Sequence, residues 1–378
     1  MGESNADSYD VALIGGGVIG CAIAWRLATS GLKTIVVERN EPGMEASFAA
    51  GGMLAAQAES DPAARLFPLA LSSRNAYPKF VQDLEAASST NVAYRSEGTL
   101  VVSLRAEDDE ELESNYAAQT EAGLDVELLT DREVLDLEPS INSSVRFALR
   151  LPGDHQVDNR LLVRALEQAA RKSGAEFSLG TEAFEVCAAE GHVRSISTSS
   201  GSILTKNAVI AAGCWSGNLT LPSTLLSRAG VSPVRGQMMA FSAPASILGS
   251  VLYSTRGYVI PRSTGIIIAG STTEYAGFTK TTTEAGLATI EAAAAEILPA
   301  LSNLPIVERW AGLRPGTADD LPVLGEDPIV KGLYYATGHY RNGILLTPIT
   351  AQVITELILN GRTSTDISTF SVTRFADR

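Results

Sequence analysis

The fold of this chain is decided near its start by Asp10-Val-Ala-Leu-Ile-Gly-Gly-Gly-Val-Ile-Gly20. The apolar residues up to Ile14 predict a fully buried strand. Gly15, Gly17 and Gly20 then follow the spacing G-x-G-x-x-G. The first glycine permits a tight turn, the second lets a diphosphate approach the backbone, and the third lets the next helix pack closely on the strand. The stretch therefore predicts a βα turn that binds a dinucleotide.

The residues after this turn support the same interpretation. Val18 to Leu27 form an apolar run that predicts a helix, whose first free N–H groups and dipole favour a diphosphate. A second strand is predicted over Thr34 to Val37, and Glu38 follows it, where an acid can hold a ribose hydroxyl. The alternative is a glycine turn in an ordinary βα unit. The strand, the helix and the acid together favour an adenine dinucleotide.

The composition is that of a globular protein with a strong negative charge. The chain has 378 residues, of which 45% are hydrophobic and 19% are charged, and its net charge is −14 at pH 7. This length is enough for two domains. The charge opposes binding to nucleic acid or to an anionic membrane surface, and its simplest role is solubility. We therefore expect neither nucleic acid nor a membrane as a partner.

Cysteine and histidine usage predicts no metal site. Cys21, Cys187 and Cys214 are odd in number and lack metal-ligand spacing, and the three histidines are far apart. This pattern is typical of reduced thiols in a cytoplasmic protein. The apolar run from Val11 to Ala28 contains four glycines and Arg26, which opposes a signal peptide or a membrane span. We expect a soluble, cytoplasmic protein.

Predicted elements of α/β character flank a region of antiparallel character. Strands are predicted at 208–212 and 332–336 and a helix at 343–359, whereas short strands and turns alternate from Val234 to Thr273. This order indicates an α/β protein with a Rossmann-type nucleotide-binding domain and an inserted, mostly antiparallel α+β substrate domain. We expect the nucleotide-binding domain at 8–85, 150–222 and 308–372, and the substrate domain at 86–149 and 223–307. The first eight or so residues are expected to be a disordered tail.

The stretch from Leu333 to Leu346 helps to identify the dinucleotide. A strand, a glycine turn and a helix beginning at about Gly343 would place a second helix N-terminus in the nucleotide-binding domain. Reduced flavin accumulates negative charge at its pyrimidine edge, which a helix N-terminus stabilises. A nicotinamide ring has no comparable need, so this pattern favours FAD over NAD.

Five blocks of sequence, in order along the chain, resemble a known family. They are Ile14-Gly-Gly-Gly-Val-Ile-Gly20, Ser47-x-x-x-Gly51-Gly-Met53, Val209-Ile-Ala-Ala-Gly213-x-Trp-Ser216, Arg309-Trp-Ala-Gly-Leu-Arg314-Pro315 and Gly338-His-Tyr-Arg-Asn-Gly-Ile-Leu-Leu346. Together they resemble the FAD-dependent D-amino-acid oxidase superfamily, and most closely the glycine oxidases of thiamine biosynthesis. The resemblance runs from about Tyr9 to Phe370. It implies a glutathione-reductase-like FAD-binding domain that holds FAD non-covalently.

The resemblance also implies the residues of the site. Its cofactor contacts come from the glycine turn, the ribose acid, the loop after it, one adenine-side residue and the C-terminal turn. They are Gly15, Gly17, Val18, Ile19, Gly20, Glu38, Arg39, Ala46, Ser47, Gly51, Gly52, Met53, Ala183, His339, Tyr340, Arg341, Asn342, Gly343, Ile344 and Leu345. The substrate-binding and catalytic residues that it implies are Tyr258, Arg314 and Arg341.

The chemistry of amine oxidation explains why these residue types suit the task. The carboxylate of an amino acid must be held still, and the planar fork of an arginine pairs both of its oxygens. Arg314 lies between Leu313 and Pro315, in an apolar and rigid context. The alternatives are an ordinary ion pair for Arg314, carbonyl capping for Arg341 and a half-buried strand tyrosine for Tyr258.

Three other polar positions, His339, Thr273 and Arg256, are expected near the cofactor or the substrate. His339 is expected along the flavin and not as a general base, because oxidation of a neutral amine needs no base from the enzyme. Thr273 stands where relatives tend to carry a bulkier apolar residue, and Arg256 also differs from the family. Both are expected to border the substrate side chain, which leaves the choice among glycine, sarcosine and small D-amino acids open.

The resemblance implies a function together with its alternatives. The first is oxidative deamination of glycine and small amines by hydride transfer to FAD, with oxygen as acceptor, giving an imine or glyoxylate, ammonia and hydrogen peroxide for thiazole synthesis. The second is a D-amino-acid dehydrogenase of the same fold with a different electron acceptor. The third is a flavin-binding scaffold without catalysis, which would have no use for a carboxylate clamp. The family commonly forms homotetramers.

Overall fold

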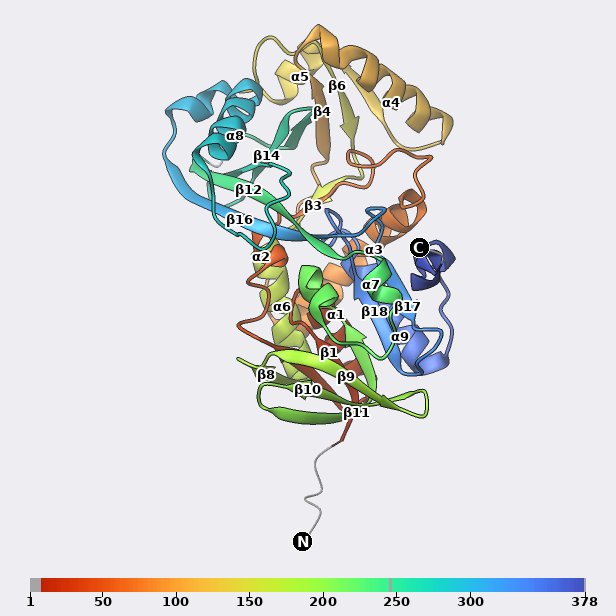
Figure 1. Ribbon diagram of the computed structural model, residues 1–378. Helices are drawn as coiled ribbons and strands as arrows, with labels where there is room; N and C mark the ends of the chain where they lie inside the picture. Colours follow the sequence, from red (N-terminus) through yellow and green to blue (C-terminus); the bar gives the residue numbers. More distant parts are fainter. Residues whose placement is uncertain (1–7, 245–246, 377–378) are drawn as a thin grey trace.

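The computed structural model describes residues 8–244 and 247–376, which form two lobes (Figure 1). The expected tail at residues 1–8 lies almost wholly outside the described residues. Each lobe is built on an eight-stranded sheet. A two-stranded ribbon of β3 (Met53–Leu54) and β7 (His155–Gln156) lies between the two lobes. The lower lobe in Figure 1 carries the N-terminal glycine turn.

The sheet of the lower lobe is mostly parallel, as the apolar strands predicted. Its order is β17-β18-β11-β1-β2-β8, and only β17 runs antiparallel to its neighbour. The strand β11 extends beyond this sheet and pairs with an antiparallel hairpin of β9 and β10. The strands are β1 (Tyr9–Ile14), β2 (Thr34–Glu38), β8 (Glu176–Leu179), β9 (Ala183–Ala189), β10 (His192–Thr198), β11 (Gly201–Ile210), β17 (Val323–Glu326) and β18 (Leu333–Thr337).

Helices and the β9–β10 hairpin cover opposite faces of this sheet. The helices α1, α3, α6 and α9 pack on one another and bury the largest apolar cluster, in which Leu13, Ile23 and Leu166 are fully inaccessible. The second face is covered by β9, β10 and α7, around Ile210 and Tyr335. The helices are α1 (Val18–Thr29), α3 (Phe67–Ser88), α6 (Asn159–Lys172), α7 (Leu225–Arg228) and α9 (Thr347–Asn360). This three-layer arrangement confirms the expected Rossmann-type fold.

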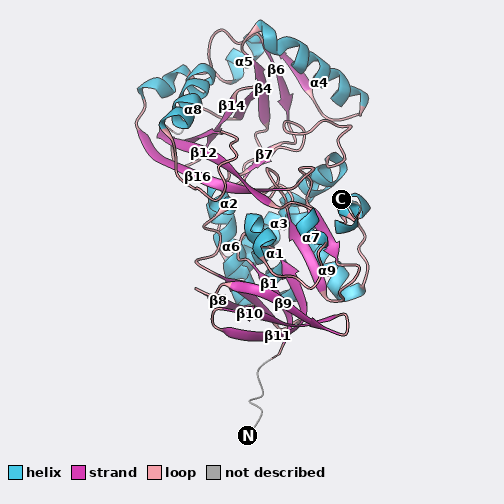
Figure 2. Ribbon diagram, in the orientation of Figure 1, coloured by secondary structure: helices cyan, strands magenta, loops and turns pink. Residues whose placement is uncertain are grey.

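The upper lobe is antiparallel except where β13 pairs with β4. Its order is β16-β12-β15-β14-β13-β4-β6-β5, and helices α4, α5 and α8 cover it (Figure 2). The strands are β4 (Thr99–Ser103), β5 (Glu127–Thr130), β6 (Phe147–Leu151), β12 (Ser232–Ser242), β13 (Val251–Ser254), β14 (Gly257–Pro261), β15 (Ile266–Gly270) and β16 (Ile306–Gly316). The helices are α4 (Asp109–Glu121), α5 (Asp131–Leu137) and α8 (Glu284–Ile297). The inserted antiparallel sheet is therefore confirmed.

Two of the expected domain limits fall inside strands of the upper sheet, and the division into domains stays a prediction. Residue 150 falls inside β6 and residue 308 inside β16, and both strands are hydrogen-bonded within the upper sheet along their length. The C-terminal helix begins at Thr347 and not at Gly343. A turn precedes it, closed by the Leu346 N–H that donates to the Asn342 carbonyl (2.8 Å), and Pro348 then stands in the first helical turn, where it needs no N–H partner.

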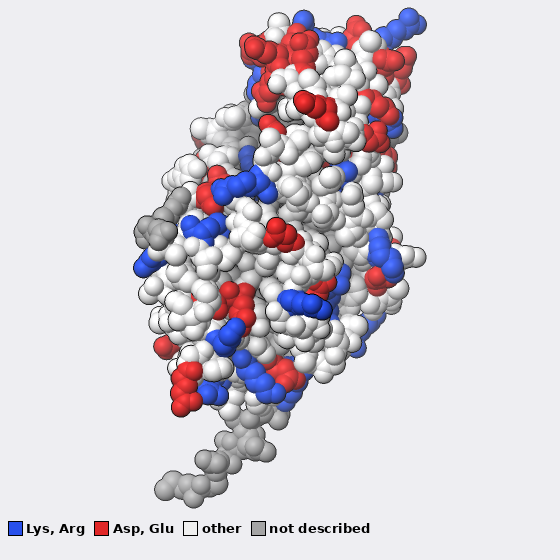
Figure 3. All heavy atoms as spheres, turned by 90° about the vertical axis from the view of Figure 1, so that its right-hand side faces the viewer, with Lys and Arg blue, Asp and Glu red and all other residues white. Residues whose placement is uncertain are grey.

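The charge of the molecule is unevenly distributed over the face in Figure 3. Acidic side chains gather at the top of that view, on the upper lobe, and charges of both signs mix below it. The helix α4 contributes three acids, Asp109, Glu110 and Glu111, to its first turn, where the helix dipole favours them. Among the described residues, no helix is long and apolar enough to cross a membrane.

Candidate active site

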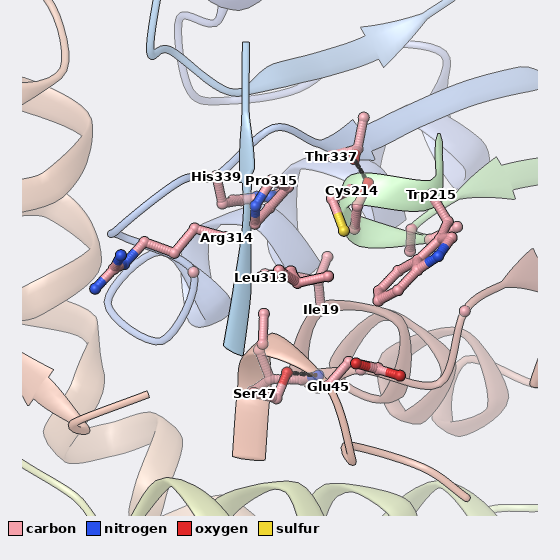
Figure 4. A pocket seen from close by; sticks show the side chains of 18 of the residues that line it. Ile19, Glu45, Ser47, Cys214, Trp215, Leu313, Arg314, Pro315, Thr337 and His339 are labelled. Carbon is pink, nitrogen blue, oxygen red and sulfur yellow. Dashed lines mark hydrogen bonds between the residues drawn. The ribbon is translucent and has the colours of Figure 1, made fainter. Parts of the chain in front are cut away.

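One cavity of about 410 Å³ lies between the two lobes and is lined by residues of both. The glycine turn after β1 and the loop after β2 form one part of its wall. Tyr258 of β14, Arg314 of β16 and Arg341 form another part. Figure 4 shows Arg314 on one side of the cavity and Glu45 and Trp215 on the opposite side. The cavity thus brings together the dinucleotide turn and the predicted carboxylate-binding residues.

The glycine turn has room for a ligand because it lacks side chains. Gly15 has a φ of +108°, and a Cβ there would lie 2.5 Å from the carbonyl oxygen of Ala211 on the neighbouring strand. A Cβ at Gly20 would collide with the carbonyl oxygen of Gly15, so this glycine allows α1 to pack against the turn. A Cβ at Gly17 would point at the Ser47 hydroxyl, 3.3 Å away. The tight turn at Gly15 and the close packing at Gly20 are therefore as the spacing predicted, whereas the approach of a diphosphate to Gly17 stays a prediction.

Polar groups around the turn are held in place by hydrogen bonds. The Glu38 carboxylate accepts from the N–H groups of Gly16 (2.7 Å) and Asn40 (2.9 Å). The Val18 N–H at the start of α1 donates to the Ser47 hydroxyl (3.0 Å). An acid at the end of β2 and a hydroxyl beside a helix N-terminus are the groups that hold a ribose and a diphosphate. The cradle that a Cβ would fill and these groups fit an adenine dinucleotide.

Most of the predicted cofactor residues line the cavity. The exceptions are Gly20, Asn342 and Leu345. Gly20 packs beneath the turn, and Leu345 belongs to the apolar core of the lower lobe. Asn342 acts through its backbone carbonyl in the turn before α9. The structure adds a group of lining residues that were not predicted as cofactor or substrate contacts, among them Glu45, Glu59, Cys214, Trp215 and Gly236.

Arg314 is held so that its guanidinium faces the cavity. Its Nη1 donates to the Thr272 carbonyl (3.0 Å) and its Nη2 to the Ser271 hydroxyl (2.8 Å). A Cβ at Gly236, on the paired strand β12, would collide with the guanidinium, so this glycine makes the room that Arg314 uses. Burial lowers the pKa of Arg314, but an arginine stays charged at neutral pH. The arrangement is a fixed cation whose remaining donors can bind a carboxylate.

Arg341 and Glu59 form a second charged group in the same part of the cavity. Arg341 is exposed at one side and donates from Nη2 to the Thr273 hydroxyl (3.3 Å). Burial opposes its charge, but the Glu59 carboxylate and the nearby tyrosine side chains together outweigh burial and raise the pKa of Arg341. Burial raises the pKa of Glu59, against the opposite influence of Arg341 and Arg314. No motif indicated Glu59, because only the fold brings it beside these arginines.

Tyr258 is buried beside Arg314. Its ring stacks on Tyr253 with 6.0 Å between centroids, and its hydroxyl donates to the Met238 sulfur (3.4 Å). Burial raises the pKa of Tyr258, so its hydroxyl stays protonated. A protonated phenol beside Arg314 can donate a hydrogen bond to a carboxylate.

His339 lines the cavity but is not arranged as a base. Its Nε2 lies 3.0 Å from the Thr350 hydroxyl, and the side chain is buried. Burial lowers the pKa of His339 to about 3, so the imidazole is neutral throughout the physiological range. A neutral imidazole of such low pKa is a poor general base, and its position along the cofactor stays a prediction.

The two positions that depart from the family have different surroundings. Thr273 touches Arg341 through its hydroxyl, although it does not line the cavity itself. The expectation for Arg256 is wrong, because this residue lies outside the cavity lining. It pairs with Asp108 (2.7 Å) and Glu296 (3.0 Å), so these two acids hold its side chain in the upper lobe.

In the part of the chain that the structure describes, no three acidic, histidine or cysteine side chains gather as metal ligands would. The three cysteines are free thiols, and Cys214 lies in the cavity wall.

Comparison with known proteins assigns the chain to a family. Residues 10–357 match the family described as FAD dependent oxidoreductase. The chain is 34% identical to a glycine oxidase of Geobacillus kaustophilus, over 97% of both proteins. The crystal structure of glycine oxidase from that organism superposes with a TM-score of 0.91 at 33% identity, covering 97% of this chain and 99% of the other.

A second relative is longer than this chain. The chain is 35% identical to the bifunctional protein ThiO/ThiG of Trichormus variabilis, with 97% of this chain covered but only 55% of the relative. The chain therefore spans about half of that fused protein. From the family match, the near-complete coverage and the geometry of the cavity, it follows that the chain belongs to the family of FAD-dependent oxidoreductases.

Proposed function

We propose that this protein oxidises glycine and small amines such as sarcosine and small D-amino acids. The balanced reaction with glycine consumes oxygen and water and gives glyoxylate, ammonia and hydrogen peroxide. The observation that carries the proposal is Arg314, a half-buried cation in the same cavity as the glycine turn and the His339–Ile344 segment. The relatives named glycine oxidase, which match over nearly their whole length, support glycine as the substrate.

The residues of this chain would divide the work as follows. The Arg314 fork binds the substrate carboxylate, and Arg341 and the Tyr258 hydroxyl add donors to it. FAD, when bound, supplies the two-electron oxidant for the α-carbon. The apolar side chains of Ile260 and Met238 pack around Tyr258 and limit the water at this end of the cavity. His339 is neutral and hydrogen-bonded to Thr350, so it would not take a proton from the substrate. The substrate ammonium group would therefore lose its proton to solvent before the oxidation step.

Within this proposal, the lower lobe is the FAD-binding domain and the upper lobe is the substrate domain. FAD would contact the glycine turn, Glu38 and Arg39 at the ribose, Ser47 near the diphosphate and the segment from His339 to Ile344 at the flavin. We also propose molecular oxygen as acceptor, a cytoplasmic homotetramer as the working form, and the supply of an imine for thiazole synthesis as the biological role. The fused ThiO/ThiG relatives support the last of these points.

The experiment is to purify the protein, record its flavin spectrum and follow peroxide release with glycine, sarcosine and D-alanine. Peroxide with glycine is the expected result. Bleaching of the flavin without air, but no peroxide in air, would favour the dehydrogenase alternative. A colourless protein that FAD does not reconstitute would overturn the whole proposal.

A further inference from the structure

One segment of the upper lobe reaches the cofactor side of the cavity. Residues 271–283, which we call the strap, join β15 to α8. The first three residues of the strap contact the carboxylate-binding arginines, since Ser271 and Thr272 accept from Arg314 and Thr273 accepts from Arg341. The later residues touch two side chains of the lower lobe, Trp215 and Glu45.

Both ends of the strap are fixed to the same strand, β12. Glu274 exchanges two backbone hydrogen bonds with Arg235 (2.8 and 2.9 Å) and accepts from the Gln237 amide (2.7 Å). At the other end, Arg235 donates to the Thr281 carbonyl (3.2 Å), and the Thr283 N–H donates to Gln237 (2.7 Å). Residues 275–280 therefore form an arch whose two flanking segments are both hydrogen-bonded to β12.

The arch makes an aromatic contact with the cavity wall. The rings of Phe278 and Trp215 lie 5.7 Å apart, tilted by 36°. The Arg39 guanidinium lies 3.8 Å from the centre of the same indole. Trp215 and Arg39 both line the cavity, whereas Phe278 stands behind them. Phe278 thus limits how far the indole can move away from the cavity.

The arch also makes an ionic contact with the wall. One oxygen of Glu45 accepts from Arg39 (2.9 Å) and the other from Lys280 (2.8 Å). Glu45 lines the cavity on the side away from Arg314, as Figure 4 shows. An unpaired carboxylate there would repel a diphosphate. Two cations around one anion leave this part of the wall positive, in a protein whose net charge is −14.

We propose that the strap is a clasp that retains FAD. Phe278 and Lys280 are positioning residues: they do not line the cavity, and they act by holding Trp215 and Glu45 against it. The proposal rests on FAD being the cofactor. The strap would then have two tasks. Its first residues hold the substrate-binding arginines by hydrogen bonds, and its arch helps to retain the cofactor.

The test measures release of FAD from the holoenzyme, which needs no turnover. Each variant is loaded with FAD and diluted, and the rise in free-flavin fluorescence gives the dissociation rate. Phe278→Ala should release FAD about two- to tenfold faster, the loss expected for one aromatic pair. Lys280→Met should release it about 1.5- to fivefold faster, as expected for one partly exposed ion pair. Phe278→Tyr and Lys280→Arg should restore the slow rate.

The chain offers a matched control on the same arch. Tyr275 is 84% exposed, so Tyr275→Ala should leave FAD release unchanged. Salt separates the two contacts, because at about 1 M the screening length falls to about 3 Å. The Lys280 effect should then disappear and the Phe278 effect should persist.

Two results would overturn the proposal. The first is release at the wild-type rate from both Phe278→Ala and Lys280→Met. The second is equal acceleration by Tyr275→Ala, which would indicate general loosening of the arch. If Phe278→Ala does not fold, Phe278→Leu and Lys280→Met carry the test. Failure of the cofactor assignment itself is recognised separately, because the unmodified protein would then bind no FAD.

Discussion

The two ends of the cavity are built in different ways. At the dinucleotide end, Gly15, Gly17 and Gly20 lie within six consecutive residues and act through absent side chains and backbone N–H groups. At the carboxylate end, side chains from distant segments converge, among them Tyr258, Arg314, Arg341 and Glu59. The first end depends on local backbone geometry, which tolerates no added atom. The second depends on charged side chains that their neighbours hold in place. Removing one of these side chains should weaken substrate binding without abolishing it.

The largest expected effect is at the dinucleotide end. In Gly20→Ala the new Cβ would meet the backbone carbonyl of Gly15, which cannot move without displacing α1 from β1. We expect FAD binding to be lost entirely, measured by the flavin spectrum after reconstitution. Gly16→Ala is the milder comparison, because its Cβ would meet only the Glu38 side chain, at 3.2 Å. Equal FAD binding by Gly20→Ala and the wild type would contradict the claim that the dinucleotide end tolerates no added atom.

The next effect is at the carboxylate end. Arg314→Ala removes a charge-assisted bond of roughly 1.5–3 kcal/mol, which corresponds to a fall in kcat/KM of about 10- to 150-fold. The flavin spectrum should change little, because Arg314 is not among the predicted cofactor contacts and lies on the opposite side of the cavity from Glu45 and Trp215. Steady-state kinetics with glycine provide the measurement. Activity near the wild-type level would mean that Arg314 is only structural.

His339 should make the stability of the folded protein depend on pH. Its pKa falls from an ordinary 6.5 to about 3 on burial, so the unfolded chain binds a proton that the folded protein does not. The stability should therefore fall as the pH drops below about 6.5, by about 2 kcal/mol at pH 5 from this residue alone. Urea unfolding at pH 7 and pH 5 tests this. His339→Gln should reduce the difference, and an undiminished difference would assign it to other groups.

A smaller effect is expected from Gly236→Ala. Its Cβ would displace the flexible end of Arg314 without removing the charge. We expect KM for glycine to rise by about three- to tenfold, equivalent to about 1 kcal/mol, with FAD binding unchanged. A KM at the wild-type value would show that the guanidinium has room to shift and still bind a carboxylate.

The smallest change concerns substrate choice. Glu59 offsets part of the positive charge of Arg341 and Arg314, so it should disfavour a substrate with a second carboxylate. In Glu59→Gln the ratio of kcat/KM for D-aspartate to that for glycine should rise by about threefold, as for a partly screened charge. Competing the two substrates in one assay measures this ratio directly. An unchanged ratio would place Glu59 outside the discrimination between substrates.

The same contrast explains what the sequence could predict. The glycine spacing, Glu38 and the order of strands predicted the cofactor fold, because each is a local pattern with a local cause. The resemblance of the blocks around Arg314 and His339 predicted which side chains share the cavity. Glu59 and Gly236 were missed, since they enter the wall only through the fold of distant segments. Trp215 belongs to a quoted block, but the sequence assigned it no role in the cavity. Arg256 was misplaced for the same reason: its partners Asp108 and Glu296 lie far away in sequence.

The most direct test of the account adds glycine to the purified holoenzyme without air and follows the flavin absorbance. We expect bleaching in the wild type, with a rate that saturates as the glycine concentration rises. In Arg314→Ala the bleaching should need a much higher glycine concentration. A flavin that stays oxidised with glycine, sarcosine and D-alanine would contradict the claim that this cavity binds an amino acid against its cofactor.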